Sequence, residues 1–232
     1  MIRVYPASSR HSTDHGWLQS NFSFSFADYY DPNNVGFGPL RVLNDDIIAP
    51  GRGFGAHPHR EMEIVSIVLK GQLKHEDSTG RSAVTTFGEV QRMSAGTGII
   101  HSEVNPGSEP THILQLWFMP DRQGLTPSYE TTEYELSRMK NALLPVVSSR
   151  SGEGIAHIHQ DMTIYMSRLE PGQSLEFVQP EGRRIYVMAI EGGLALNGGT
   201  KLEERDAARI EETPRLTMES EAGSLLMLID LP

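Results

Sequence analysis

The strongest constraint on the fold is a series of short apolar or alternating segments, which turn-forming residues interrupt about every ten positions. Phe22, Phe24 and Phe26 alternate with serines, and the turn-forming sequence YYDPNN follows them. Later segments of the same character are IVSIVLKGQL at 64–73, HILQLWFMP at 112–120 and IYVMAIEGG at 185–193. Because strand side chains alternate between two faces, this pattern predicts an all-β sandwich or barrel.

Bulk composition limits the classes of function. The 232 residues, 38% of them hydrophobic, suffice for one large β domain or two small ones. A formal net charge of −10 argues against direct binding to nucleic acid or to an anionic membrane. The chain has no cysteine, which excludes a disulfide scaffold and thiol catalysis. No apolar run resembles a signal peptide or a membrane span, so we expect a cytoplasmic protein, and we take it to be a monomer.

The two halves of the chain look like copies of one β unit. Each half has a Pro-Gly pair and, 20 residues after its glycine, a second glycine that ends an apolar strand, at 50–51 and 71 and at 171–172 and 192. In this register the counterparts of His57, His59 and Glu63 are Val178, Pro180 and Arg184. The second copy therefore keeps the scaffold without the histidines.

Two histidines one residue apart lie near the start of a predicted strand, in 55-GAHPHREMEI-64. On a strand, His57 and His59 project to the same face and can share one metal ion. Pro58 between them has no N–H, which favours an edge strand or the first residues of a strand. Alone, such a pair is also typical of solvated or hydrogen-bonded histidines.

A second pair of candidate ligands, His101 and Glu103, occurs in 94-SAGTGIIHSEVNPG-107 and can again share one face. Gly96 and Gly98 predict a turn with close backbone contact or positive φ, which would deliver His101 to the start of a strand. Three imidazoles and one carboxylate suit a first-row divalent metal and leave two octahedral positions open for a substrate and dioxygen.

At this point the residues resemble a known family. Gly51-x5-His57-x-His59-x3-Glu63-x7-Gly71 is similar to the first cupin motif, and Gly98-x2-His101-x3-Asn105 is similar to the end of the second. The stretches 31-DPNNVGFGPLRVLNDD-46, 53-GFGAHPHREMEI-64 and 94-SAGTGIIHSE-103 resemble the pirin family of bicupins.

The resemblance implies two antiparallel β-barrel (jelly-roll) domains in tandem. We expect an N-terminal cupin domain with a metal site at 1–134, a linker with a short helix at 135–150, and a degenerate C-terminal cupin domain without metal at 151–232. The partly helical pattern at 134–147 and the small polar stretch SSRSGEG that follows it agree with this division.

The resemblance also implies one divalent metal ion per chain, held by His57, His59, His101 and Glu103. The expected ion is Fe(II), and the donor types also suit Zn, Ni, Co, Cu or Mn. Some pirins cleave flavonols as quercetin 2,3-dioxygenases, with release of carbon monoxide, and others regulate a transcription factor or a metabolic enzyme.

Two functions therefore stay open: a dioxygenase acting on a small aromatic enol, and an iron-dependent regulator that binds a protein partner. In the enzyme, Glu103 would accept the proton of the substrate hydroxyl. A metal-free sugar-binding or isomerase cupin is disfavoured, because all four ligand types are present.

Several neighbouring residues have more than one interpretation. Glu63 has the parity to face the barrel interior, and we prefer a supporting or ion-paired role to direct ligation. Gln115 is either a hydrogen-bonded core amide or a contact to the substrate or to a ligand. Apolar residues expected to line the site are Phe54, Ile64 and Phe118. The remaining histidines, His157 and His159 among them, are expected to play surface or local roles.

Overall fold

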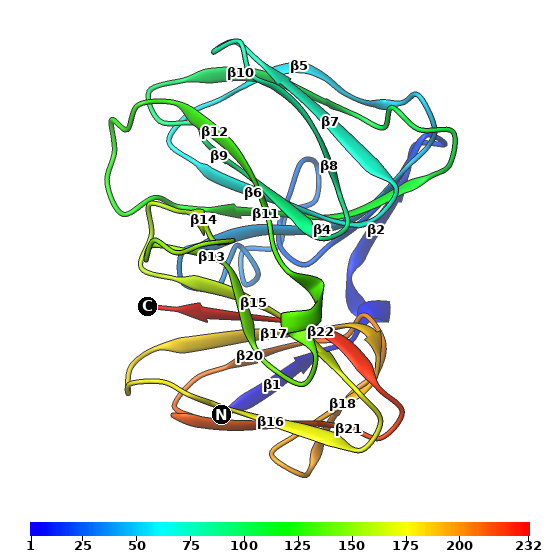
Figure 1. The fold of residues 1–232 in the computed structure, drawn as a ribbon, viewed down its shortest axis with the longest axis vertical. Coiled ribbons are helices and arrows are strands. Elements are labelled where there is room, and N and C mark those ends of the chain that lie inside the picture. The colour runs from blue at the N-terminus through cyan, green and yellow to red at the C-terminus, as the bar shows by residue number, and fades with distance from the viewer. The chain divides into compact units, whose positions relative to one another are not determined.

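Antiparallel strands make up nearly all of the regular structure in the computed structural model, which describes residues 1–232 (Figure 1). The predicted all-β class is confirmed. The only helices are two short 3-10 turns, η1 (Ala7–Ser9) and η2 (Leu136–Met139), and neither has the length and hydropathy that a membrane-spanning helix needs. The chain divides into two units.

The N-terminal unit comprises His11–Tyr134 and Ser149–Gln160 and contains two sheets. The larger sheet has the strand order β12-β9-β6-β11-β4-β3-β2, and the smaller has the order β5-β10-β7-β8. The strands are β2 (His11–Asp14), β3 (Leu18–Phe22), β4 (Leu40–Ile48), β5 (Gly53–His59), β6 (Glu63–Lys70), β7 (Gln72–Asp77), β8 (Ser82–Thr86), β9 (Glu89–Ser94), β10 (Ile99–Val104), β11 (Thr111–Phe118), β12 (Ser128–Glu133) and the short β14 (Ala156–His157).

The C-terminal unit comprises Met1–Arg10, Glu135–Ser148 and Asp161–Pro232. Its larger sheet has the order β1-β20-β17-β22-β15-β13, and its smaller sheet has the order β16-β21-β18-β19. The strands are β1 (Ile2–Tyr5), β13 (Leu144–Ser148), β15 (Thr163–Leu169), β16 (Gln173–Val178), β17 (Arg184–Gly192), β18 (Leu194–Leu196), β19 (Thr200–Leu202), β20 (Ala207–Ile210), β21 (Arg215–Ser220) and β22 (Ser224–Leu231).

The two units repeat one strand order, which confirms the internal repeat. In the smaller sheets, β16-β21-β18-β19 follows the same order as β5-β10-β7-β8. In the larger sheets, β20-β17-β22-β15 corresponds to β9-β6-β11-β4, and β1 occupies the position that β12 has in the N-terminal unit. The first ordered strand of the chain thus completes the sheet of the second unit.

Two segments belong to a different unit from the one that their place in the sequence suggests. Residues 1–10 belong to the C-terminal unit because β1 pairs with β20, with Ile2 opposite Ile210. Residues 149–160 belong to the N-terminal unit. The short helix expected in the linker is the single turn η2, and β13 after it pairs with β15. The domain limits 1–134, 135–150 and 151–232 remain a prediction.

Apolar side chains fill both ends of the N-terminal unit, and polar side chains lie between them. One buried cluster includes Val68 and Ile113, and the other includes Ile64, against which Trp117 packs. Because alternate residues share a face, Ser66 and Gln115 lie between the two clusters on β6 and β11. The interior is therefore polar at its middle, facing the smaller sheet.

Gly53 allows β5 to lie against β10. A Cβ atom at this position would lie 2.1 Å from the carbonyl oxygen of Glu103 and 2.6 Å from the Cα of Val104. Gly55, two residues along the same strand, has no atom within 4 Å of an added Cβ.

We expect Gly53→Ala to destabilise the protein by about 1–3 kcal/mol, because backbone atoms of β10 cannot move aside as a side chain could. Urea unfolding measures this difference. Gly55→Ala is the matched control on the same strand, and equal stability losses for the two variants would contradict the importance of the close contact.

Candidate metal centre

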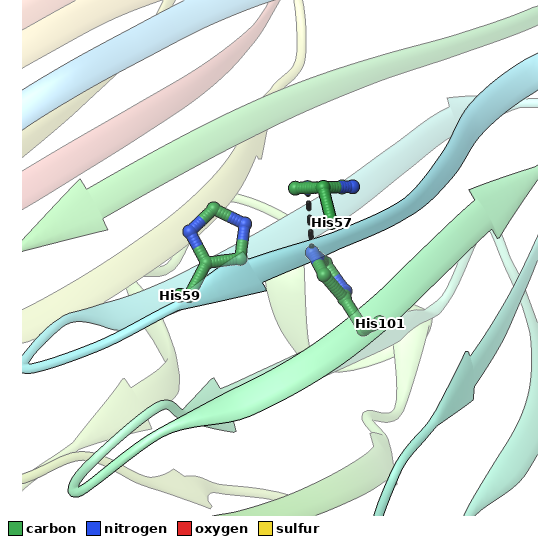
Figure 2. A group of neighbouring side chains, drawn as sticks. All are labelled: His57, His59 and His101. Carbon is green, nitrogen blue, oxygen red and sulfur yellow. Dashed lines mark hydrogen bonds between the residues drawn. The ribbon is translucent and has the colours of Figure 1, made fainter.

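Strands β5 and β10 bring three histidines together (Figure 2). His57 and His101 are Cα partners across the two strands, and β5 is an edge strand, as Pro58 predicts. The ring centroids of His57, His59 and His101 lie 4.5–4.8 Å from one another. The prediction that His57 and His59 project to one face is confirmed. Gly96 and Gly98, in the turn before β10, have positive φ as expected.

The Nε2 atoms of these histidines make no contact with a hydroxyl, amide or carbonyl group. Nδ1 of His57 lies 2.6 Å from the carbonyl oxygen of Gly55, so that nitrogen donates and Nε2 is left with its lone pair. Nε2 of His59 is buried without a hydrogen-bond partner. Nε2 of His101 lies 3.1 Å from Nε2 of His57.

Burial favours the neutral form of two of these imidazoles, those of His59 and His101. Burial, helped by the neighbouring His57, lowers the pKa of His59 to about 4 and that of His101 to about 3. A neutral imidazole has one free lone pair, which is the form that binds metals.

The donor set fits a first-row divalent cation. Two lone pairs facing each other at 3.1 Å repel unless a cation lies between them. Nitrogens bound at about 2.1 Å and at right angles would be about 3 Å apart, close to that separation. The ligand atoms of all three histidines lie within 4.8 Å of one another.

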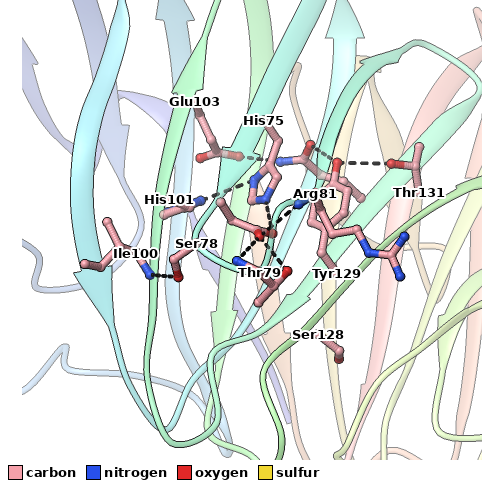
Figure 3. Close-up of polar contacts among 12 residues, drawn as sticks. His75, Ser78, Thr79, Arg81, Ile100, His101, Glu103, Ser128, Tyr129 and Thr131 are labelled. Carbon is pink, nitrogen blue, oxygen red and sulfur yellow. Dashed lines mark hydrogen bonds and ion pairs between the residues drawn. The ribbon is translucent and has the colours of Figure 1, made fainter.

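Glu103 is buried, and amide and hydroxyl donors surround it. Figure 3 shows it near His101 and His75. Oε1 accepts hydrogen bonds from Ser66 Oγ at 3.2 Å and from Gln91 Nε2. Oε2 accepts one from Gln115 Nε2 at 2.6 Å. Burial raises the pKa of Glu103 to about 7, against these hydrogen bonds. Glu103, His101 and His75 form a second set of possible ligands, and their ligand atoms also lie within 4.8 Å of one another.

Gln115 is the hydrogen-bonded core amide that one of its two interpretations predicts. It is a buried core amide, 7% exposed, and it donates to Glu103 while its Oε1 accepts from Trp117 Nε1 at 3.2 Å. Phe54, which we expected to line the site, packs instead in the apolar cluster at one end of the unit, with its ring 5.7 Å from that of Trp17.

We expected Glu63 and Phe118 to face the barrel interior. This expectation is wrong, because both side chains lie on the opposite face of the sheet. Ser66 contacts Glu103, so even-numbered residues of β6 face the site and Glu63 faces the other side. Oε2 of Glu63 accepts hydrogen bonds from Ser94 Oγ at 3.0 Å and from the His159 backbone N–H at 3.1 Å. Phe118 pairs with Glu63 and shares its face. Ile64 keeps its expected place on the interior face.

Trp117 is the aromatic side chain that the sequence analysis missed. Its ring lies 4.7 Å from that of His59, edge to face. The alternation that places Gln115 in the interior also places Trp117 there, so this signal was present in HILQLWF.

The expectation of a surface or local role for His75 is also wrong. His75 is fully buried, its Nε2 lies 2.8 Å from Asp77 Oδ2, and its Nδ1 lies 3.4 Å from Nδ1 of His101. The pairing of β7 with β10 creates this contact. His159 Nδ1 lies 3.4 Å from Glu63 and 3.2 Å from Ser94 Oγ, and the ring of His157 lies 4.9 Å from it.

An open groove of about 490 Å³ adjoins His59. Its lining is mostly apolar, and Arg60, which is exposed, supplies the positive charge. The lining residues are Pro58, His59, Arg60, Ser78, Gly98, Ile99 and Ile100.

Two barrels with one strand order, only the first of which gathers a histidine cluster, define a bicupin. The family model described as Pirin matches residues 4–118, and the model described as Quercetinase C-terminal cupin domain matches residues 145–231. The chain therefore belongs to the pirin family.

Individual relatives agree over the full length. The chain is 42% identical to Quercetin 2,3-dioxygenase of Escherichia coli (strain K12), over 100% of this chain and 99% of that protein. It superimposes on the crystal structure of the bacterial pirin YhhW from Escherichia coli in complex with nickel(II) with a TM-score of 0.94 and 39% identity, over 100% and 99% of the two chains. A Quercetin 2,3-dioxygenase from Acinetobacter baumannii, 24% identical, shares the fold with a TM-score of 0.79 over 98% and 85% of the chains.

A second buried carboxyl, that of Asp46 on β4, accepts a hydrogen bond from Ser20. Burial raises its pKa to about 7, and the charges of Asp45 and Glu103 add to the effect. The folded protein therefore keeps Asp46 protonated over a pH range in which the unfolded chain releases that proton. Its contribution to stability is complete below about pH 4 and is lost as the pH rises towards 7.

We expect Asp46→Asn to become more stable relative to the wild type as the pH rises from about 4 to about 7, by roughly 4 kcal/mol in total. Urea unfolding of both proteins at each pH measures the difference. The exposed Asp28→Asn is the control and should show no such trend. A constant difference between Asp46→Asn and the wild type would contradict the raised pKa.

Proposed function

We propose that this protein is a metal-dependent oxidoreductase that cleaves a flavonol such as quercetin at its 2,3 bond with dioxygen and releases carbon monoxide. The observation that carries the proposal is the convergence of three bare Nε2 atoms beside a buried carboxyl group. The names of relatives that match over the full length support the reaction.

In this proposal His57, His59, His101 and Glu103 hold one divalent ion, and Fe(II) is its native identity. Imidazole and carboxylate donors suit Fe(II) and equally accept the nickel named for YhhW. When bound, the ion would lower the pKa of an enolic hydroxyl and bring dioxygen next to the electron-rich ring.

Glu103 has one acceptor position to offer. A carboxylate has about four lone-pair positions. Ser66 and Gln91 occupy Oε1, and Gln115 occupies one position of Oε2. The remaining position on Oε2 can serve one partner at a time: it would contact the ion, and it would accept the substrate proton once that contact is released. The three donors fix the orientation of the carboxyl group.

Arg60, which follows His59 and is exposed, could attract an enolate or phenolate oxygen of a flat substrate. Trp117 packs edge to face against His59 and limits the movement of that ring.

Metal content and turnover test the proposal together. We expect the purified protein to contain about one divalent ion per chain and, with quercetin, to consume dioxygen and release carbon monoxide in equal amounts. Removal of the ion by a chelator should abolish both, and Fe(II) should restore them. Full metal occupancy without dioxygen uptake or carbon monoxide would contradict the flavonol reaction.

The ligand assignment has its own test. We expect His101→Ala to lose the metal and all turnover, because the two imidazoles of β5 and Glu103 would hold the ion too weakly without the third imidazole. His157→Ala removes a histidine of the other His-x-His pair and should keep both. Elemental analysis of the two purified variants measures the metal directly, and a His101→Ala protein with full occupancy would exclude this residue as a ligand.

A further inference from the structure

A chain of side chains leads from the proposed metal site to the turn between β7 and β8 (Figure 3). Nδ1 of His101 faces Nδ1 of His75 at 3.4 Å, and Nε2 of His75 faces Asp77 Oδ2 at 2.8 Å. His75 and His101 are 0% and 2% exposed, so water does not substitute for these contacts. The ring of Tyr129 stacks on His75 with a centroid distance of 3.9 Å and an angle of 9° between planes.

Asp77 is held ionised and oriented. Its Oδ1 accepts hydrogen bonds from Thr79 N at 2.7 Å, Thr79 Oγ1 at 2.6 Å and Arg81 N at 3.3 Å. Burial opposes ionisation, yet these hydrogen bonds and the one from His75 hold the pKa of Asp77 below its ordinary value. Burial lowers the pKa of His75 despite Asp77, so its imidazole is neutral.

These contacts determine which ring nitrogen of His75, and then of His101, carries the proton. An ionised Asp77 only accepts, so His75 carries its single proton on Nε2 and leaves Nδ1 bare. The facing Nδ1 of His101 must then carry the proton of that contact. A metal-binding His101 that donates from Nδ1 has its lone pair on Nε2, and this is the atom that lies 3.1 Å from Nε2 of His57.

We propose that Asp77 and His75 are positioning residues that set the tautomer of His101 and direct its Nε2 lone pair to the metal. This inference rests on the proposed metal centre. It adds two supporting residues to that centre, both on β7, a strand that contributes none of the four proposed ligands. Partners of this kind typically change metal affinity by a factor of about 10–100.

Asp77→Asn keeps the shape of the side chain but reverses the donor and acceptor roles in the contacts from residue 77 through His75 to His101. Three donors at Oδ1 fix the amide so that its NH₂ group faces His75. Nε2 of His75 must then accept, its proton moves to Nδ1, and His101 is left with its proton on Nε2. The nitrogen needed by the metal is then protonated. Thr79→Ala is the matched control, because it weakens the same turn and leaves the contact between Asp77 and His75 in place.

The tautomer of His101 is measured on the full-length, metal-free protein by the nitrogen-15 shifts of its ring. We expect the proton on Nδ1 in the wild type and in Thr79→Ala, and on Nε2 in Asp77→Asn. A wild-type His101 that carries its proton on Nε2 would overturn the inference, and this result needs no variant to fold.

Nickel(II) affinity, measured by competition with a chelating indicator, is the second readout. We expect Asp77→Asn to bind about 10–100 times more weakly than the wild type and Thr79→Ala to bind equally well. His75→Phe keeps the stacking on Tyr129 and removes both nitrogens, and it should lose affinity similarly. In the His75→Phe background, Asp77→Asn should cause no further loss, because the chain is already broken.

The outcomes separate this inference from the proposed function. A wild type without affinity for nickel(II) or Fe(II) would remove the metal centre itself. Tight binding by the wild type with unchanged affinity in Asp77→Asn and His75→Phe would overturn only the roles of Asp77 and His75. Additive losses in the double variant would equally contradict a single chain, since independent structural damage adds.

Discussion

The antiparallel contact between β5 and β10 is the interaction on which the candidate site depends. It places His57 opposite His101 although the two are far apart in sequence, and it requires Gly53, where the backbones lie too close for a Cβ atom. Pairing of β10 with β7 on its other edge places His75 opposite Glu103 and in contact with His101. Strand β10 thus has candidate ligands along one edge and their hydrogen-bonding partners along the other.

The second unit shows what this fold looks like without the site. In the matching positions of the larger sheets, Val187 and Leu228 replace Ser66 and Gln115, and both belong to a continuous apolar core. On the smaller sheet, Val178 pairs with Arg215 where His57 pairs with His101. The polar interior of the first unit is therefore not needed for folding, and its buried imidazoles and carboxyls are retained at a cost in desolvation that hydrogen bonds only partly offset.

The sequence predicted what depends on local alternation. It predicted most of the strands, the shared face of His57 and His59, the edge position of β5 and the repeat between the halves. It was wrong at 22-FSFSF-26, because β3 already ends at Phe22. It failed where the answer depends on register between distant strands, because a shift of one residue exchanges the two faces. Glu63 and Phe118 were assigned to the wrong face for this reason, and Trp117 was overlooked. His75 is recognisable only once β7 is known to pair with β10.

The exchanged position of β1 has a consequence for biosynthesis. Its partner β20 lies about two hundred residues later, with Ile2 opposite Ile210. A ribosome adds residues one at a time from the N-terminus, so β1 must wait unpaired while the whole first barrel is made and can fold. The charged and polar residues around it, such as Arg3 and the nearby Arg10, would help to keep the waiting segment in solution. The sheet of the second barrel can therefore be completed only after β20 has been made.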